Sequence, residues 1–452
     1  MHKNRKSFLE RQGDKFHFHG FHFISDKRWF EQNIKWLLVG IFLLTLSVIL
    51  GMFMHFSMKS IYHNNHSAWA IATNLVNGRG YTACDEKYFP FCTTGNQTTA
   101  MREPIPVLLT AITMWIYPSI KSSFIIQSLL FLGTLLFVYL ILKKYDRRLA
   151  FLAALLWLLS KSVLTQLGSD TGELASAFFL SVGLYFFMRG MNDPVRILNW
   201  ALSGFFMGLA SLSRTVMLGT SMGLGLFLLL FHLYQRHENI FKSRKENIMP
   251  AFFFLTSLLL VYTPWIIRND MVFGSPVIGS TLTGYNVYRM NSIVANTPFS
   301  PHYVGPDDAY TALTQLVHKG DLRGNENEAQ MQSVYMSAGL QLIDKHPIQY
   351  VELVAYRFLS LWFNASVNAA YRSRLTLVDY IGLIEQAFLL MAVIVGGTKN
   401  WKALWPLILI LLLGSGAYML IDAQLRYLVD FMPAVVILAA SAFAKLQPIT
   451  SS

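Results

Sequence analysis

The chain has 452 residues, of which 54% are hydrophobic and 14% charged, and its formal net charge is +12. A soluble globular chain carries about 25% charged residues, so this composition excludes an ordinary soluble domain and indicates lipid as the solvent. The basic residues gather in the N-terminal tail and between apolar runs, a distribution that favours anionic lipid over nucleic acid as a partner.

The first long apolar run covers residues 36–54 and follows a tail rich in lysine and arginine. Because basic residues stay on the cytoplasmic side, residues 1–35 are predicted to form a cytoplasmic tail. The run begins late and no small-residue cleavage site follows it, so we expect a retained membrane helix instead of a removable signal peptide.

Further apolar runs recur along the chain, and a run of about 18 uncharged residues can cross a bilayer as a helix. They cover residues 124–142, 149–167, 171–188, 197–213, 215–233, 249–267, 377–395, 403–421 and 427–444. If successive runs cross the bilayer in opposite directions, the basic connections between them lie on the same side of the membrane as the N-terminal tail. The sequence therefore predicts an all-α polytopic membrane protein with about ten spanning helices.

Two segments are too long and polar to be simple turns, residues 55–123 and residues 268–376, and both are predicted to lie outside the cytoplasm. They divide the chain into a transmembrane module over residues 36–267, an outer-face region, and C-terminal helices over residues 377–452. Residues 104–118 are apolar but too short to span, so an interfacial position is expected. The amphipathic stretch 357–363 is expected on the outer membrane surface.

The chain has two cysteines, Cys84 and Cys92, and both fall in the first outer segment. An oxidising compartment would allow them to form a disulfide, which we favour over two unpaired thiols.

Three arginines stand at the predicted outer ends of separate helices: Arg214, Arg268 and Arg426, the last followed by Tyr427. Guanidinium groups match phosphate oxygens bidentately, so these arginines could together bind a phosphate or pyrophosphate. The alternative is that each anchors its helix at the interface by snorkelling.

Several motifs carry a resemblance to a known family. GLASLSR at residues 208–214 resembles the small-residue helix ending in arginine of bacterial GT-C glycosyltransferases, relatives of protein O-mannosyltransferases and aminoarabinose transferases. The order PW, RN, FGSP, ST and GYN over residues 264–286 is similar to the pattern that follows a mid-chain helix in that family. Arg102-Glu103-Pro104 and Arg426-Tyr427 resemble two further family segments.

The resemblance implies a GT-C-like helix bundle whose two outer-face loops contain short helices. It implies transfer of a sugar from a polyprenyl-phosphate donor to a glycan, lipid or protein acceptor at the outer face of a bacterial inner membrane. The residues expected to bind the donor phosphate or line the substrate site are Arg214, Arg268, Arg426, Tyr427, Arg102, Glu103, Asn269 and Asn286. No cofactor is firmly implied; some relatives use a divalent cation, but this site is poor in acidic groups.

One departure concerns the base that activates the acceptor. The family usually has an aspartate in the first outer loop, and here Asn64 occupies that position; an amide cannot accept a proton at neutral pH. The substitutes in the sequence are His63 and His66 in the same loop, and Glu173, which aligns with an acidic family position, with Asp170 nearby. Asp85 and Glu86 also lie in that loop, but we favour a solvated surface role for them.

Two other functions remain open on the sequence. The chain could be an inactive relative that binds a polyprenyl lipid or a partner enzyme, because a fold can outlast its chemistry. A flippase for lipid-linked glycans would need polar residues along several helices, yet Lys161 and Glu385 are the main charges inside apolar runs, which disfavours that function.

Overall fold

The computed structural model describes residues 27–55, 68–84, 89, 92, 97–119, 121–169, 171–238, 248–292, 324–363 and 376–446. Within these residues every regular element is helical, apart from an isolated bridge between Thr82 and Thr98. The predicted all-α class is confirmed.

The chain divides into two compact units, residues 1–51 and residues 52–452. The first contains most of helix α3, Lys27–His55, whose segment Phe30–Met54 is apolar and long enough to cross a membrane. This segment contains the whole of the first predicted run.

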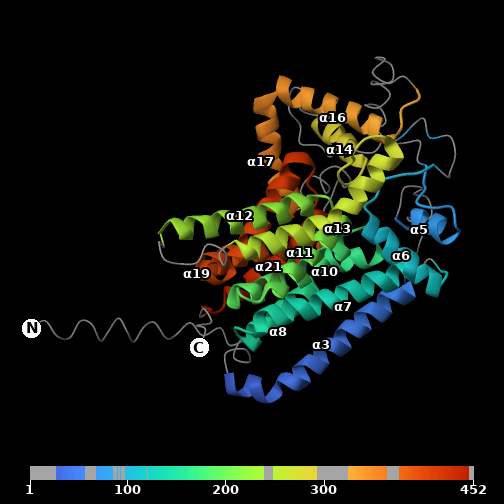
Figure 1. Cartoon of the computed structure of the whole chain (residues 1–452). Coiled ribbons are helices and arrows are strands. Elements are labelled where there is room, and N and C mark those ends of the chain that lie inside the picture. Colours follow the sequence, from blue (N-terminus) through green and yellow to red (C-terminus); the bar gives the residue numbers. More distant parts are fainter. Residues whose placement is uncertain are drawn as a thin grey trace, which may run out of the picture. The chain divides into compact units, whose positions relative to one another are not determined.

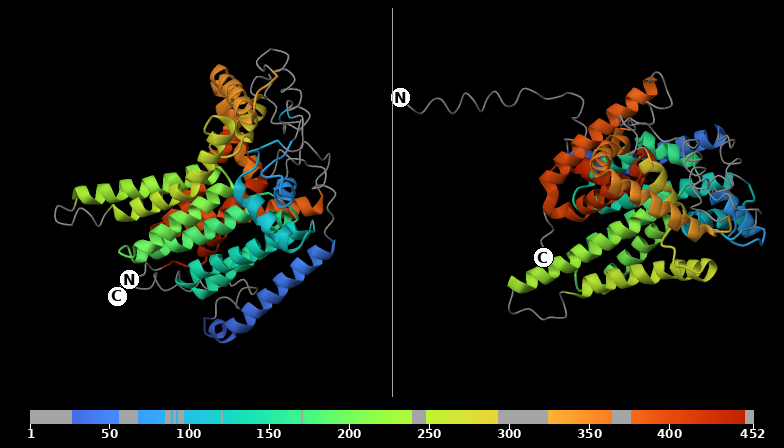
Figure 2. Two further views of the ribbon diagram at one scale, coloured as in Figure 1. Left: turned by 45° about the vertical axis from the view of Figure 1, so that its right-hand side comes forward. Right: turned by 90° about the horizontal axis from the view of Figure 1, so that it is seen from above.

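The second unit holds the remaining helices, drawn in Figures 1 and 2. They are α5 (Ala68–Val76), α6 (Pro104–Ile116), α7 (Lys121–Lys143), α8 (Arg147–Leu159), α9 (Lys161–Leu164), η1 (Thr165–Gly168), α10 (Glu173–Asn192), α11 (Ile197–Ser213), α12 (Val216–Glu238), α13 (Met249–Phe273), α14 (Leu282–Asn291), α16 (Glu328–Lys345), α17 (Pro347–Phe363), α19 (Leu377–Ile421), α20 (Leu425–Leu428), η3 (Val429–Phe431) and α21 (Met432–Ser441).

Fewer helices than predicted are long enough to span a bilayer. The described residues contain 5 such helices, or up to 6 if α8 and the bent segment after it, at 53°, form one span. Helix α11 and the described part of α12 are shorter apolar helices, as is α6, which was not expected to span. The chain is a multi-pass membrane protein, and this count covers the described residues and takes α19 (Leu377–Ile421) as one helix.

The predicted last span is wrong as a single helix. Residues 427–444 break into α20, the 3-10 turn η3 and α21, with Pro433 in the first turn of α21. Proline lacks a backbone N–H and clashes with the preceding helical turn, so a helix restarts there more readily than it continues.

Helix α19 runs from Leu377 to Ile421, but Asn400 and Leu404 within it have non-helical backbone angles. A straight helix of 45 residues would extend roughly 68 Å. Yet Asp379 near its start and Gln424 just past its end line the same cavity, so α19 folds back on itself between the two predicted runs.

The interior of the bundle forms around α10, α11 and α21, which run close together in Figure 1. Every residue of α21 is buried. Where α11 crosses α13, a Cβ on Gly204 would lie 2.0 Å from the carbonyl oxygen of Phe254, so this close approach requires glycine.

The two predicted outer segments pack together at one end of the unit. Helices α14, α16 and α17 lie at that end in Figures 1 and 2. Ile71 of α5, Tyr285 of α14 and Tyr335 of α16 share one buried apolar cluster. Cys84 and Cys92, whose Cα atoms are 5.6 Å apart, are joined by a disulfide beside this cluster.

A buried carboxylate links the same two segments. Glu328 at the start of α16 accepts hydrogen bonds from the backbone N–H of Ala100 and the hydroxyl of Thr281, both at 2.8 Å. Burial raises the pKa of Glu328 above its ordinary value, and these donors and nearby Arg268 oppose the shift.

Helix α17 does not place its arginine at a lipid surface, as expected for residues 357–363. Arg357 is 3% exposed, and its guanidinium donates to the carbonyl oxygens of Met290, Met419 and Leu420 and to the side chain of Asn291, at 2.8–3.1 Å. The two terminal nitrogens of the guanidinium carry these hydrogen bonds, which offset the cost of burying the charge, while Nε has no partner. It fastens α17 to α14 and to the end of α19.

Candidate active site

Arg214 lies at the centre of a buried charged cluster. It follows the last residue of α11 with extended backbone angles, φ −149° and ψ 119°, and its side chain turns inward. Its Nη1 is 3.6 Å from Oε1 of Glu173, and its Nε is 3.6 Å from Oδ2 of Asp430. Both carboxylates are fully buried, so the guanidinium is their charge partner in a medium of low polarity.

Glu173 reaches Arg214 because the residue before it is glycine. A Cβ on Gly172 would lie 2.3 Å from the carbonyl oxygen of Ser213 and 3.1 Å from Cδ of Arg214. Only a residue without a side chain allows the start of α10 to approach the end of α11 this closely.

We expect Gly172→Ala to lower the free energy of unfolding by about 1–3 kcal/mol, because the backbone of α10 or α11 must shift. The same shift would separate Glu173 from Arg214 and reduce activity. Gly219→Ala is the matched control, because a Cβ on Gly219 in α12 meets nothing within 4 Å. Thermal unfolding in detergent measures both; equal stability of the two variants would contradict the packing explanation.

A second arginine shares an aromatic ring with the first. The Cζ atoms of Arg214 and Arg426 lie 4.9 Å and 5.1 Å from the centroid of Tyr427. Tyr418 stacks on the same ring at 4.7 Å, and its hydroxyl donates to Asp430. Cation–π contact holds each guanidinium over the ring without consuming all of its N–H donors.

The two arginines differ in how their charge is balanced. Arg214 has two carboxylate partners, whereas in the described part of the chain no carboxylate forms an ion pair with Arg426, which is exposed. The hydroxyl of Tyr427 donates to Asp422 at 3.0 Å, and Asp422 pairs with Arg289 at 3.6 Å. Arg426 is therefore the cation of this cluster with capacity for an added anion.

The contacts of Arg268 within the described residues are with other groups than this cluster, and its expected role beside Arg214 and Arg426 stays a prediction. Its Nη1 donates to the carbonyl oxygen of Thr99 at 2.9 Å and to the side chain of Asn269 at 2.8 Å. Its guanidinium lies over three aromatic rings, those of Tyr81, Trp265 and Phe273. These contacts make Arg268 part of the packing around the two segments predicted to lie outside the cytoplasm.

The other residues expected to line the substrate site, Arg102, Glu103, Asn269 and Asn286, differ in their contacts and burial. Oε1 of Glu103 accepts from the backbone N–H and hydroxyl of Thr215, at 3.2 and 2.8 Å, and so supports the residue next to Arg214. The hydroxyl of Tyr81 donates to the carbonyl oxygen of Arg102. Asn269 is buried and donates to the carbonyl oxygen of Val277, and Asn286 is half-buried on α14.

Four expected catalytic residues, His63, Asn64, His66 and Asp170, lie outside the described residues. Of the expected catalytic groups only Glu173 is described, and its burial against Arg214 fits an ion partner better than an accessible base. Among the described residues, no group of three or more His, Cys, Asp or Glu side chains could hold a metal ion.

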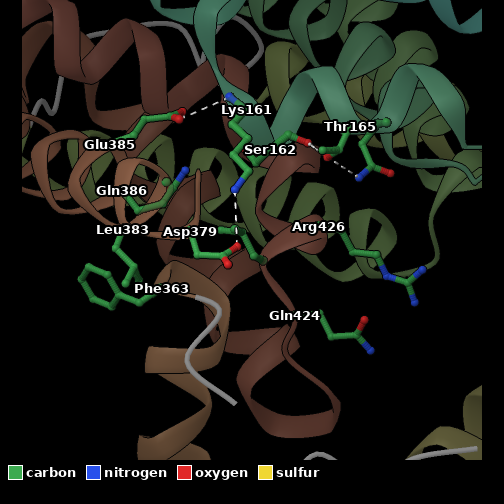
Figure 3. Close-up of a pocket in the computed structure, with 13 residues that line it drawn as sticks. Lys161, Ser162, Thr165, Phe363, Asp379, Leu383, Glu385, Gln386, Gln424 and Arg426 are labelled. Atoms are coloured by element: carbon green, nitrogen blue, oxygen red, sulfur yellow. Dashed lines mark hydrogen bonds and ion pairs between the residues drawn. The ribbon is translucent and has the colours of Figure 1, made fainter. Parts of the chain in front are cut away.

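Beside Arg426 the structure has a cavity of about 280 Å³ that the sequence did not predict (Figure 3). Lys161 and Glu385, noted only as charges inside apolar runs, both line it. Lys161 lies just after the break between α8 and α9, and its Nζ is 3.8 Å from Asp379. Lys161 and Asp379 are more than 200 residues apart in the sequence, so no local sequence pattern predicts that they pair.

Comparisons with known proteins agree with this architecture. The profile of the family described as dolichyl-phosphate-mannose-protein mannosyltransferase matches residues 102–267, just over a third of the chain. No curated protein sequence matches the chain.

Among solved structures, the archaeal oligosaccharyltransferase AglB from Archaeoglobus fulgidus, in complex with an inhibitory peptide and dolichol-phosphate, is similar. The TM-score is 0.50 at 15% identity, over 92% of this chain and 50% of that one. A second structure of the Archaeoglobus fulgidus oligosaccharyltransferase, tethered to an acceptor peptide, gives 0.51 at 16% identity and the same coverage. ArnT from Cupriavidus metallidurans bound to undecaprenyl phosphate gives 0.40 at 12% identity, over 90% and 78% of the two chains.

The chain is thus an all-α, multi-pass membrane protein with a GT-C-like helix bundle, and its resemblance to GT-C membrane glycosyltransferases is confirmed. It spans about half the length of the archaeal oligosaccharyltransferase it matches.

Proposed function

We propose that this protein transfers a sugar from a polyprenyl-phosphate donor to an acceptor at the outer face of a bacterial inner membrane. In this proposal the N-terminus lies in the cytoplasm, and the acceptor is a glycan, a lipid or a protein. The observation that carries the proposal is the pair Arg214 and Arg426 on the ring of Tyr427, with Arg426 in no direct ion pair among the described residues.

The chemistry assigns a distinct task to each arginine. The bond between the sugar C1 and the phosphate oxygen breaks while an acceptor oxygen bonds to C1, so negative charge grows on the departing phosphate. A guanidinium fixed beside that oxygen stabilises this charge as it develops. Arg426 would contact the phosphate, and Arg214, held by Glu173 and Asp430, would add its positive field without needing to move.

The acceptor hydroxyl must lose its proton, and we assign this step to the group comprising His63, His66 and Asp170. Glu173 is proposed as a positioning residue for Arg214. Asn64 would orient the acceptor, since its amide can donate and accept hydrogen bonds but cannot hold the proton.

The proposal predicts that Arg426→Ala lowers the rate of sugar transfer by about 100-fold, the usual effect of removing one group that stabilises developing charge. Transfer is measured in vesicles of defined orientation with a panel of labelled polyprenyl-phosphate sugars. Arg196→Ala, which removes an exposed arginine at the start of α11, is the matched control.

Native protein that transfers no sugar from any donor in the panel, while still binding the lipid, would favour an inactive lipid-binding relative. Arg426→Ala with the native rate would remove this arginine from the site.

A further inference from the structure

The cavity beside Arg426 has several polar groups set in a largely apolar lining. Amide, hydroxyl, carboxylate and ammonium groups line it, contributed by α9, η1, the start of α19 and the segment before α20. Figure 3 shows Lys161 reaching across to Asp379, with Gln424 and Arg426 together on one side. Polar groups are costly inside a membrane protein and usually mark a site of function.

The walls are held in place by hydrogen bonds. Oε1 of Glu385 accepts from the hydroxyl of Ser160 at 2.8 Å, and Oε2 accepts from the backbone N–H of Lys161 at 3.3 Å. Thr165 donates to the carbonyl oxygen of Ser162 at 2.8 Å. The polar groups are thus positioned before any ligand arrives, which lowers the entropic cost of binding.

One wall residue has a hydrogen-bond acceptor that no protein group uses. Gln386 is 2% exposed, and its Oε1 has no hydrogen-bond partner. A buried amide oxygen without a partner costs about 1–3 kcal/mol, so its retention is best explained by a molecule in the cavity that donates to it.

The charged side chains that line the cavity favour a neutral ligand that is rich in hydroxyl groups. Lys161 is paired with Asp379, and Glu385 adds a second carboxylate to the wall, so a phosphate placed there would face two negative groups. Sugar hydroxyls both donate and accept, and they suit a wall that mixes amides, hydroxyls and carboxylates. The edge of the cavity, where Arg426 lies, suits a phosphate better than the interior does.

Arg426 connects this cavity to the arginine pair. It lines the cavity, while its Nη2 lies 3.4 Å from the hydroxyl of Tyr427, whose ring also carries Arg214. At about 280 Å³ the cavity is just below the usual size of small-molecule sites, about 300–1,000 Å³, and this volume suits one sugar unit.

We infer that the cavity lined by Lys161, Asp379, Glu385 and Gln386 holds the single sugar of the lipid-linked donor, with its phosphate at Arg426. This inference rests on the proposed function and adds the location of the sugar to it. The donor sugar would be a monosaccharide whose hydroxyl groups reach the oxygen of Gln386.

The test compares two lipids on the purified full chain in nanodiscs: undecaprenyl phosphate, and undecaprenyl phosphate carrying glucose, mannose, galactose, N-acetylglucosamine or 4-amino-4-deoxyarabinose. We expect at least one sugar-bearing lipid to bind about tenfold more tightly than the bare lipid, the gain from one or two added hydrogen bonds. Gln386→Leu, of similar volume, should abolish this preference and leave the affinity for the bare lipid unchanged.

A second cavity variant and a control variant test whether the loss of preference is specific to the polar groups of the cavity. Thr165→Val removes only a hydroxyl from the cavity and should reduce the preference in the same direction, by about threefold to fivefold. Ile384→Leu, on the same helix with 70% of its side chain exposed, should retain the full preference.

Equal affinity for the bare lipid and every sugar-bearing lipid would overturn the inference, as would a full preference in Gln386→Leu. Because both lipids carry the phosphate, absence of binding by either would instead overturn the proposed function.

Discussion

Replacing Arg214 with alanine is expected to lower the free energy of unfolding by about 3–5 kcal/mol, because two carboxylates lose their charge partner. Glu173 and Asp430 are both fully buried and neither can reach water to recover its hydration. Transfer should be lost in the same variant, since the ring of Tyr427 would then carry one guanidinium instead of two.

Thermal unfolding in detergent, read together with transfer in vesicles, measures both effects. The double variant Arg214→Ala with Glu173→Gln should recover part of the stability, because one buried charge has been removed with its partner, and none of the activity. Arg196→Ala serves as the matched control. If Arg214→Ala unfolds at the same temperature as the native protein, the buried ion cluster does not stabilise the fold.

Arg357→Leu is the second large effect, an expected loss of about 3–5 kcal/mol in the free energy of unfolding. Its guanidinium donates hydrogen bonds to three backbone carbonyl oxygens and to the side chain of Asn291. All four acceptors would lose these hydrogen bonds in the variant. Since these acceptors lie on α14 and at the end of α19, the variant should also loosen the attachment of α17.

Glu352→Ala on the same helix removes an exposed side chain and should change stability by no more than about 0.5 kcal/mol. Arg357→Lys keeps the charge but loses the planar set of donors, so an intermediate loss is expected. Native stability of Arg357→Leu in thermal unfolding would mean that the carbonyl oxygens find other donors.

The helices were the most predictable part of the molecule. The predicted run 197–213 coincides with α11, and α7, α10 and α13 contain most of the runs predicted at 124–142, 171–188 and 249–267. Long apolar runs specify helices because lipid offers the backbone no other hydrogen-bond partners. The break between α8 and α9 and the turn at Pro433 depend on packing and local backbone chemistry, so hydropathy alone missed them.

The site was only partly predictable. Local motifs identified Arg214, Arg426 and Tyr427, and the structure brings these three together. For Arg268, position at a helix end did not reveal that Tyr81 and Thr99, far earlier in the chain, supply its contacts. Asp430 and the cavity residues depend on α19 folding back, which is a tertiary property.

The most direct test of the account is a structure of the protein with undecaprenyl phosphate bound. We predict that the phosphate lies within hydrogen-bond reach of Arg426, beside the ring of Tyr427 and near Arg214. A phosphate bound at Arg268 or at the exposed basic connections, with Arg426 left without an anion, would contradict it.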